Sequence, residues 1–339
     1  MTLGQFTYTE IISQTEAWRE AIAVTRAASL PNSEKYEQVV FAGCGSTYYL
    51  SLAAAALYQE LTGRMARAVP SGELLLNSQT VLRDNISQLL VAISRSGTTT
   101  ETVRAVEKFK KEKRGVVIVI SNYDEVLSQF GDVNIIIPRG QEESVAQTRS
   151  FASMFVATTA MCARMAGRSD LVNAMSALPE VGQRLMIRDF EPVARELGEN
   201  LSYDRFYFLG SGIRYGLACE VNLKMKEMTL THSEPFHFLE FRHGPMSMVN
   251  QNAVVVGMLS DANLSHEKAV LNEMQALGGK IVSLAESNAN VSFKSQIPEQ
   301  VRGVLYLPAL QLMAYYPSLA KGLNPDRPTN LTAVVKLDL

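Results

Sequence analysis

The fold of this chain is decided by residues 91–101, which read Val-Ala-Ile-Ser-Arg-Ser-Gly-Thr-Thr-Thr-Glu. The apolar run from Leu89 to Ile93 ends abruptly in hydroxyl side chains around one glycine. A helix-forming stretch then follows from Glu101 to Lys113. This order predicts a strand, a tight turn and the N-terminus of a helix.

The turn between the predicted strand and helix carries Ser94, Ser96, Thr98 and Thr99. A helix N-terminus presents unpaired backbone N–H groups and a partial positive charge, which suit a phosphate. An ordinary N-cap needs only one Ser or Thr, so this many hydroxyls in one turn favours a phosphate site over simple capping.

Several other strands in the first half of the chain are continuously apolar. Residues 39–46 read Val-Val-Phe-Ala-Gly-Cys-Gly-Ser, an apolar strand running into a glycine turn, and further apolar runs lie at 89–93, 116–120 and 133–137. Helical patterns separate these runs. Continuous rather than alternating apolar strands, with helices between them, indicate a parallel sheet covered on both faces.

The second half of the chain repeats this plan. Residues 206–213, Phe-Tyr-Phe-Leu-Gly-Ser-Gly-Ile, carry the same glycine turn 167 residues later. A helical stretch and apolar runs at 253–259, 281–284 and 303–307 follow it. Such turns also arise by chance, but the matching order of later segments favours a duplication. We therefore predict an α/β protein made of two similar three-layer αβα sandwiches, each with a mainly parallel sheet.

A length of 339 residues exceeds the usual size of a single core, so two domains are expected. The predicted parts are an N-terminal helical segment (1–34), a first sandwich (35–168), a helical linker (169–198), a second sandwich (199–325) and a C-terminal tail (326–339).

Composition excludes several classes of partner. With 47% hydrophobic residues, 19% charged residues and a net charge of −2, the chain offers no electrostatic case for nucleic acid or an anionic membrane. Its three scattered cysteines do not form a disulfide framework and fit a reducing cytoplasm. The N-terminus lacks the features of a signal peptide. The longest apolar stretch, 151–166, is short for a bilayer span and is expected to be a buried helix. A cytoplasmic location is expected.

The first glycine turn, Gly43-Cys-Gly45, also invites a dinucleotide-binding interpretation. That fingerprint needs a third glycine for close packing of helix on strand. Tyr48 occupies the required position here, and Tyr215 occupies it in the second copy. Glu73 is available as the ribose-binding acid, but the missing glycines weigh against a dinucleotide.

The densest group of titratable residues lies in the second half. Glu220, Lys224 and Glu227 are spaced by four and three residues on a predicted helix, so they share one face. A surface ladder of ion pairs is the alternative. Residues 231–245 follow, with three of the four histidines of the chain among acids and aromatics, a combination that favours acid–base chemistry.

A metal site is a further alternative in this segment. His237, Glu240 and His243 are spaced by three and three residues, which a helix could present together. Gly244-Pro245 stops a helix at that point, and no HExxH pattern occurs, so metal binding is disfavoured.

A phosphate cradle together with a carboxylate and a histidine suits proton transfer on a sugar phosphate. Opening a cyclic sugar needs an acid–base group at the ring oxygen, for which imidazole is apt near neutral pH. Moving a proton between C1 and C2 of the open chain needs one carboxylate that reaches both carbons.

Over residues 35–339 the chain resembles the tandem sugar isomerase (SIS) domain family, and within it the isomerase half of glucosamine-6-phosphate synthase. The motifs that carry the resemblance are Cys44-Gly-Ser-Thr-Tyr48, Ser94-Arg-Ser-Gly-Thr-Thr99, Val145-Ala-Gln-Thr-Arg149, Leu223-Lys-Met-Lys-Glu227, Phe241-Arg-His-Gly-Pro245 and Asp326-Arg-Pro-Thr-Asn-Leu331.

The resemblance implies roles for particular residues. Glu227 would move the proton between C1 and C2 with Lys224 beside it. His243 would open the ring from the neighbouring subunit, which implies a homodimer with shared sites. The implied phosphate ligands are Ser46, Thr47, Ser94, Arg95, Ser96 and Thr99, and the implied sugar contacts are Gly45, Ala146 and Gln147. No metal or organic cofactor is implied.

The departures from the family motifs reduce the number of reactions that can be expected of this chain. The synthase has a lysine that forms an imine with fructose 6-phosphate, and Ala333 stands in its place here. Arg95 replaces a glutamine and Gln147 replaces a serine. The glutaminase half is also missing from this sequence, so transfer of an amide nitrogen is not expected.

The resulting hypothesis is a glucosamine-6-phosphate deaminase, which converts a 6-phosphorylated amino sugar and water into fructose 6-phosphate and ammonia. An aldose–ketose isomerase or deglycase of another 6-phosphosugar is the alternative enzyme. A non-catalytic sugar-phosphate sensor is the alternative of another class, although a sensor has no need of Glu227 and His243.

Overall fold

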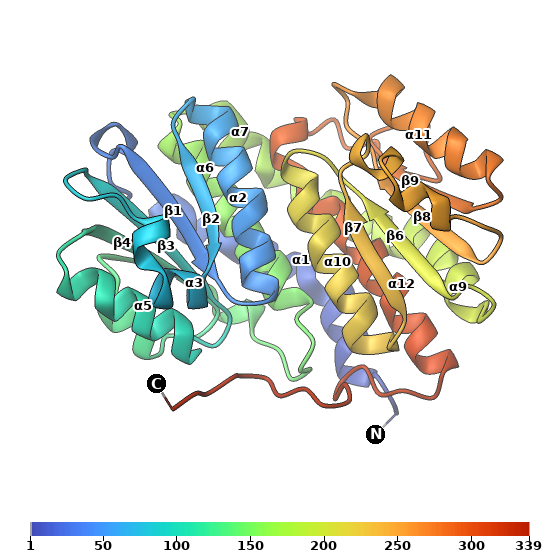
Figure 1. Ribbon diagram of the computed structural model, residues 1–339, viewed down its shortest axis with the longest axis horizontal. Coiled ribbons are helices and arrows are strands. Elements are labelled where there is room, and N and C mark those ends of the chain that lie inside the picture. Colours follow the sequence, from blue (N-terminus) through green and yellow to red (C-terminus); the bar gives the residue numbers. More distant parts are fainter. Residues whose placement is uncertain (1, 339) are drawn as a thin grey trace. The chain divides into compact units, whose positions relative to one another are not determined.

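The computed structural model describes residues 2–338 (Figure 1). Met1 and Leu339, the outermost residues of the predicted N-terminal segment and tail, lie outside the described residues. The chain forms two compact units. The N-unit comprises residues 13–142, 149–176 and 332–338, and the C-unit comprises 2–12, 143–148 and 177–331. The boundaries predicted from the sequence stay a prediction.

The N-unit is built on a five-stranded parallel sheet of order β2-β1-β3-β4-β5. Its strands are β1 (Gln38–Gly43), β2 (Ala66–Pro70), β3 (Gln88–Ser94), β4 (Gly115–Ser121) and β5 (Val133–Ile136). Its helices are α2 (Ser46–Thr62), α3 (Ser71–Leu76), α4 (Ser78–Val81), α5 (Thr100–Lys111), α6 (Arg149–Met165) and α7 (Ser169–Ala174), with 3-10 turns η1 (Ser33–Lys35), η2 (Val126–Phe130) and η3 (Pro138–Gly140). Two elements, α1 (Gln5–Ala27) and η4 (Met175–Ala177), contain residues of both units.

The C-unit has a second five-stranded parallel sheet, of order β10-β9-β8-β6-β7. Its strands are β6 (Arg205–Leu209), β7 (His232–Phe236), β8 (Ala253–Met258), β9 (Lys280–Ala285) and β10 (Val291–Ser292). Its helices are α8 (Leu178–Leu185), the π-helical η5 (Met186–Phe190), α9 (Glu191–Glu199), α10 (Ile213–Thr229), α11 (Leu264–Ala276) and α12 (Leu307–Ala320), with 3-10 turns η6 (Glu240–Arg242), η7 (Pro245–Met248), η8 (Glu299–Val301) and η9 (Gly303–Tyr306).

The two sheets have the same topology, because numbering the strands of each unit in chain order gives 2-1-3-4-5 in both. The glycine turns match as well. Gly45 and Gly212 precede α2 and α10 with φ of 55° and 59° and ψ of −122° and −131°, a region that only glycine visits readily. The predicted fold class of two similar αβα sandwiches is confirmed.

Burial explains the continuous apolar runs of the sequence. Every residue of β1, β3 and β8 is buried, since helices cover both faces of each sheet. The apolar stretch at 151–166 forms most of α6 and is buried almost throughout. Among residues 2–338, no helix is long and apolar enough to cross a membrane.

The apolar run at 303–307 does not form a strand like those of the first half. It forms η9 and leads directly into α12, whose first turn contains Pro308, a residue favoured at that position of a helix. The fifth strand of the C-unit is instead the two-residue β10. The run continues far past the length of a strand, and that continuation is the signal for a buried helix.

Candidate functional site

The carboxyl ends of β1 and β3 in the N-unit mark the point where the strand order reverses. In open α/β sheets with the order 2-1-3-4-5, ligands bind in the crevice at this switch point. The turn after β1 leads into α2, and the turn after β3 leads into α5. Two helix N-termini therefore follow adjacent strands at the place where the sequence predicts a phosphate.

The turn after β3, residues 94–99, is called the phosphate loop below. Gly97 has φ of 66°, and a Cβ there would lie 3.0 Å from the Cβ of Glu125. Its N–H donates to Ser94 Oγ at 3.2 Å. Ser96 Oγ accepts from both the N–H and the hydroxyl of Thr98, each at 3.2 Å, which leaves its own proton to donate.

The N-terminus of α5 is not closed by its own cap. Thr99 stands at the N-cap, yet its side chain makes no capping hydrogen bond, and its hydroxyl lies 3.5 Å from Ser94 Oγ. The hydroxyls of this turn therefore surround a helix N-terminus whose first N–H groups have no capping side chain. This arrangement suits an anion.

The turn after β1 is closed by one of the predicted ligands. Thr47 Oγ1 accepts from the N–H of Cys44 at 2.8 Å and donates to its carbonyl at 2.9 Å. A Cβ on Gly43 would come within 2.5 Å of the Thr47 backbone, so the turn requires glycine there. Thr47 thus holds the turn together, while Gly45 and the buried Ser46 begin α2. Phosphate contacts from Ser46 and Thr47 stay predictions.

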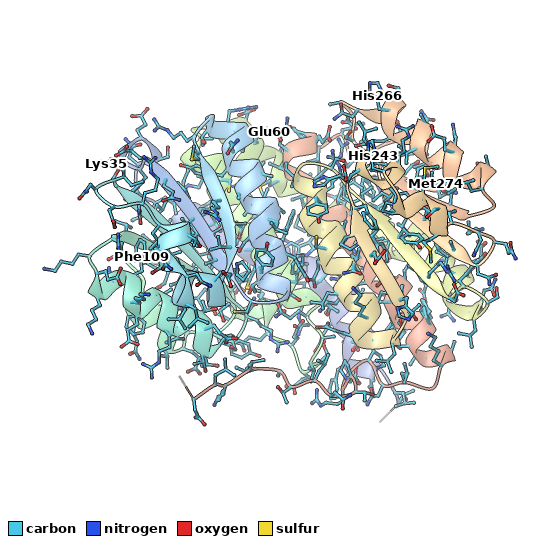
Figure 2. All side chains as sticks on the ribbon, viewed as in Figure 1. Lys35, Glu60, Phe109, His243, His266 and Met274 are labelled. Atoms are coloured by element: carbon cyan, nitrogen blue, oxygen red, sulfur yellow. The ribbon has the colours of Figure 1, made fainter. Side chains whose placement is uncertain are left out.

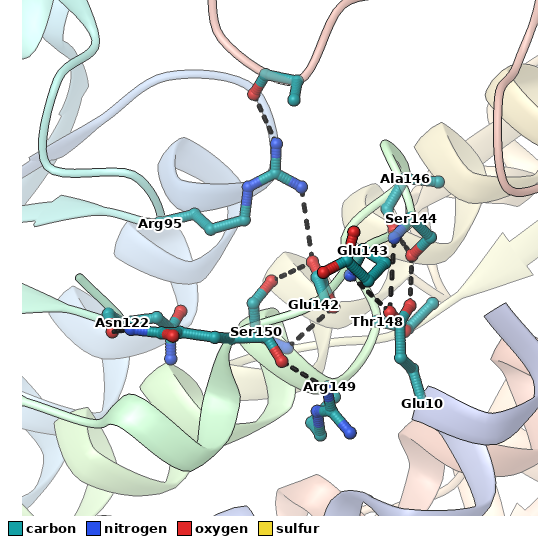
Figure 3. A network of polar contacts seen from close by, with 12 residues as sticks. Glu10, Arg95, Asn122, Glu142, Glu143, Ser144, Ala146, Thr148, Arg149 and Ser150 are labelled. Carbon is teal, nitrogen blue, oxygen red and sulfur yellow. Dashed lines mark hydrogen bonds and ion pairs between the residues drawn. The ribbon is translucent and has the colours of Figure 1, made fainter. Parts of the chain in front are cut away.

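Arg95 of the phosphate loop is engaged with other groups of the N-unit (Figure 3). Its guanidinium forms an ion pair with Glu142 at 3.3 Å and also donates to the carbonyl of Ala333. Glu142 accepts from the N–H of Ser150 at 3.1 Å and from the Ser150 hydroxyl. Sequence reasoning missed Glu142. Its partner Arg95 lies 47 residues away, and no local pattern links two residues so far apart in the sequence.

The C-unit holds the charged cluster that the sequence predicts on one helix face. Lys224 Nζ lies 2.5 Å from Glu227 Oε2 and 3.4 Å from Glu220 Oε1 on the same face of α10, as the spacing predicted. The side chains of Lys224 and Glu220 are 1% and 2% exposed, whereas that of Glu227 is 19% exposed. The cluster is therefore no surface ladder, and Glu227 is its accessible member.

The predicted sugar contacts Ala146 and Gln147 lie in the segment 143–148 of the C-unit. Ala146 packs with Met228, which follows Glu227, and with Ala314. Among the described residues, the buried Oε1 of Gln147 has no hydrogen-bond partner. A buried acceptor without a partner is unfavourable unless a ligand supplies the donor, so this oxygen suits a substrate hydroxyl or amine.

Segment 143–148 is held in place by the carboxylate of Glu10 and by the main-chain carbonyl of Asp326. Glu10 accepts from the N–H groups of Glu143 and Ser144, at 2.6 and 3.2 Å (Figure 3). The N–H of Val145 donates to the carbonyl of Asp326 at 3.0 Å. The carboxylate of Asp326 in turn accepts from the N–H of Thr7 at 2.8 Å.

His243 lies between η6 and η7 in the C-unit and is exposed (Figure 2). The main-chain N–H of His243 donates a hydrogen bond to the main-chain carbonyl of Glu240 at 2.9 Å. The nearby His237 stacks on Tyr215 with ring centroids 3.9 Å apart, and burial lowers the pKa of its imidazole. Within residues 2–338, no three side chains of His, Cys, Asp or Glu are grouped as a metal site requires.

Comparison with known proteins identifies the family. A family model described as SIS domain matches residues 34–164 and 202–297, one match in each half of the chain. The chain belongs to the SIS domain family. The family assignment made from the six motifs is thereby confirmed.

Relatives of this SIS protein include aminotransferases. The isomerizing glutamine–fructose-6-phosphate aminotransferase of Pyrococcus horikoshii is 30% identical over 352 residues, which cover 98% of this chain and 58% of the relative. That of Thermococcus kodakarensis is 26% identical, with 58% of its length covered. The SIS chain thus spans little more than half the length of these relatives.

Solved structures also resemble this SIS chain. Glucosamine-6-phosphate deaminase from Thermotoga maritima matches with a TM-score of 0.81 and 25% identity, covering 98% of this chain and 100% of that one. Tagatose-6-phosphate ketose/aldose isomerase from Escherichia coli matches with a TM-score of 0.85 and 21% identity, covering 99% and 98%. The latter likeness supports the fold alone.

Proposed function

We propose that this protein is a glucosamine-6-phosphate deaminase, which converts glucosamine 6-phosphate and water into fructose 6-phosphate and ammonia. The observation that carries the proposal is the carboxylate of Glu227, the accessible member of an otherwise buried cluster, held by Lys224 at 2.5 Å. The relative from Pyrococcus horikoshii and the solved structure from Thermotoga maritima, whose names refer to 6-phosphosugars, support the same class of enzyme.

The proposed reaction begins with binding and ring opening. Backbone N–H groups and hydroxyls of the phosphate loop and of the turn Gly45–Thr47 hold the phosphate. A direct contact between Arg95 and the phosphate stays a prediction. His243 transfers a proton between the ring oxygen and the C1 hydroxyl, which gives the open-chain aldehyde.

The next step moves a proton from C2 to C1. The carboxylate of Glu227 removes the C2 proton, the electrons left behind form the C1–C2 double bond of an enolamine, and the C1 oxygen takes up a proton from the ammonium group of the substrate. Glu227 then returns the proton to C1, so that C1 becomes an alcohol carbon and C2 an imine. Lys224 fixes the orientation of the carboxylate during both transfers, and the partnerless oxygen of Gln147 accepts a hydrogen bond from a substrate group.

Hydrolysis completes the reaction. Water adds to the C2 imine, and the resulting carbinolamine expels ammonia and leaves the C2 ketone of fructose 6-phosphate. No amide donor and no imine-forming lysine takes part, which is consistent with Ala333 at the position of that lysine in the resembling motif. Atoms balance with one water consumed for each ammonia released.

Pure protein incubated with glucosamine 6-phosphate is expected to release ammonia and fructose 6-phosphate in equal amounts. The Glu227→Gln variant serves as the control for contaminating activity. Ammonia no greater than in this control would reject the deaminase. Interconversion of another 6-phosphosugar from a panel of aldoses and ketoses, without ammonia, would instead establish the isomerase alternative, which needs the same proton transfer.

We also propose that the enzyme works as a homodimer in which His243 serves the site of the neighbouring subunit. The exposure of His243 within its own unit supports this arrangement. Mixed dimers of Glu227→Gln and His243→Ala subunits then contain one site with both changes and one intact site. Co-expression with two tags is expected to recover about half of the wild-type kcat in the mixed dimer, although each parent is nearly inactive. Recovery of no activity would contradict a shared site.

A further inference from the structure

Two residues that depart from the family motifs contact each other in the N-unit. Arg95 stands where the resembling motif has glutamine, and its guanidinium donates to the main-chain carbonyl of Ala333, which stands where the motif has lysine. We propose that Arg95 is a positioning residue that ties the C-terminal segment 332–338 to the phosphate loop and thereby strengthens binding of the substrate phosphate. The inference rests on the proposed function only for its kinetic consequence.

The position of the Arg95 guanidinium is fixed by further contacts in the N-unit. It pairs at 3.3 Å with Glu142, whose side chain is fully buried (Figure 3). Glu142 in turn accepts two hydrogen bonds from Ser150 in the first turn of α6, where the helix dipole also favours a carboxylate. The Arg95 carbonyl accepts from Asn122 N–H and Ser121 Oγ, both at 3.2 Å, so its main chain is fixed as well.

The charge balance argues against phosphate binding as the main role of Arg95. An arginine attracts an anionic ligand most strongly when no neighbouring carboxylate already compensates its charge. Here the buried carboxylate of Glu142 compensates it, and the planar guanidinium presents further N–H groups in fixed directions, one of which reaches Ala333. This geometry suits a bridge between the core of the N-unit and the C-terminal segment.

A second tie places the segment along the start of α5. The N–H of Leu337 donates to Thr100 Oγ1 at 3.1 Å, and Thr100 is the first residue of that helix. Residues 333–337 therefore run from the phosphate loop to the uncapped N-terminus beside it. Val335 and Leu337 remain 50% and 44% exposed, so polar ties rather than apolar burial hold the segment.

This placement has a consequence for binding. A main-chain segment beside the phosphate loop reduces access of water to the bound phosphate, which strengthens its hydrogen bonds to the loop. Since the segment is exposed and the two ties described above hold it to the N-unit, loss of one is expected to release most of the segment, and loss of the other then to add little. The two ties are therefore expected to be coupled.

The experiment is a double-mutant cycle in the full-length chain with Arg95→Gln, Thr100→Val and both together. Arg104→Gln is the matched control, since Arg104 lies on α5 in an exposed pair with Glu107. Hydrogen exchange of the amides at 334–338 is measured without substrate, and kcat and KM are measured with glucosamine 6-phosphate. Arg95→Lys tests whether charge alone suffices.

We expect Arg95→Gln to speed exchange of the tail amides and to raise KM, each about tenfold, while kcat changes less than about threefold. Thr100→Val should have a smaller effect of the same kind, and the double variant should resemble Arg95→Gln rather than the product of the two effects. Arg95→Lys should restore little, and the control should match wild type.

Opposite results would overturn the proposal. If Arg95→Gln raised KM while the tail amides stayed protected, or if the two effects on KM multiplied, Arg95 would be a direct phosphate ligand. If the wild-type protein released no ammonia, the proposed function would fail, yet hydrogen exchange would still report whether Arg95 anchors the tail.

Discussion

Replacing Glu227 with glutamine is expected to lower kcat for ammonia release about 10³-fold and to leave KM within about threefold of wild type. Glutamine has nearly the same shape as glutamate but cannot take up the C2 proton. The fold should survive, because Lys224 keeps Glu220 as its counter-ion at 3.4 Å. Steady-state rates, together with loss of deuterium from substrate labelled at C2, measure the effect directly.

Glu199→Gln is the matched control for this variant. Glu199 lies at the end of α9 in the same unit, 66% exposed, with its nearest ion-pair partner 3.8 Å away. Its removal should change kcat by less than twofold. If Glu227→Gln kept more than about a tenth of the wild-type kcat, or exchanged C2 deuterium at the normal rate, another group would be the base.

Replacing Lys224 with methionine should lower the free energy of unfolding by about 3–5 kcal/mol. The substitution removes the cation that lies 3.4 Å from the buried carboxylate of Glu220 and 2.5 Å from the carboxylate of Glu227 on the same helix face. Urea unfolding followed by circular dichroism measures the loss. Lys226→Met is the matched control, since Lys226 lies on the exposed face of α10 and should cost less than about 0.5 kcal/mol.

A second substitution separates the structural role of Lys224 from its role at the site. In Lys224→Met/Glu220→Gln the buried charge of Glu220 is gone together with that of Lys224, so much of the lost stability should return. The activity should stay low, because nothing then holds the carboxylate of Glu227 in place. Full recovery of kcat in the double variant would contradict a positioning role for Lys224.

Local patterns were enough to predict the fold and the contacts among the three charged residues of α10. The apolar strands and glycine turns follow from rules about neighbours in the sequence, and so does the shared face of Glu220, Lys224 and Glu227. The topology of both sheets agrees with those expectations.

Contacts between distant parts of the chain could not be predicted in this way. The partnership of Arg95 with Glu142 and Ala333 depends on residues 47 and 238 positions away. The two-residue β10 carries too little sequence to show a period, and the run at 303–307 was expected to resemble the strands of the first half. In each case tertiary packing decides what the local pattern leaves open.

The division of the chain constrains how the protein is made. Residues 2–12 and 143–148 belong to the C-unit, whose last residue is 331, and residues 332–338 return to the N-unit. A nascent chain emerging from the ribosome therefore has neither unit complete before residue 331 is translated, and the pairing of Thr7 with Asp326 forms only after residue 326 has emerged. Neither unit can be excised as one uninterrupted piece of the gene, because each unit contains segments that are far apart in the sequence.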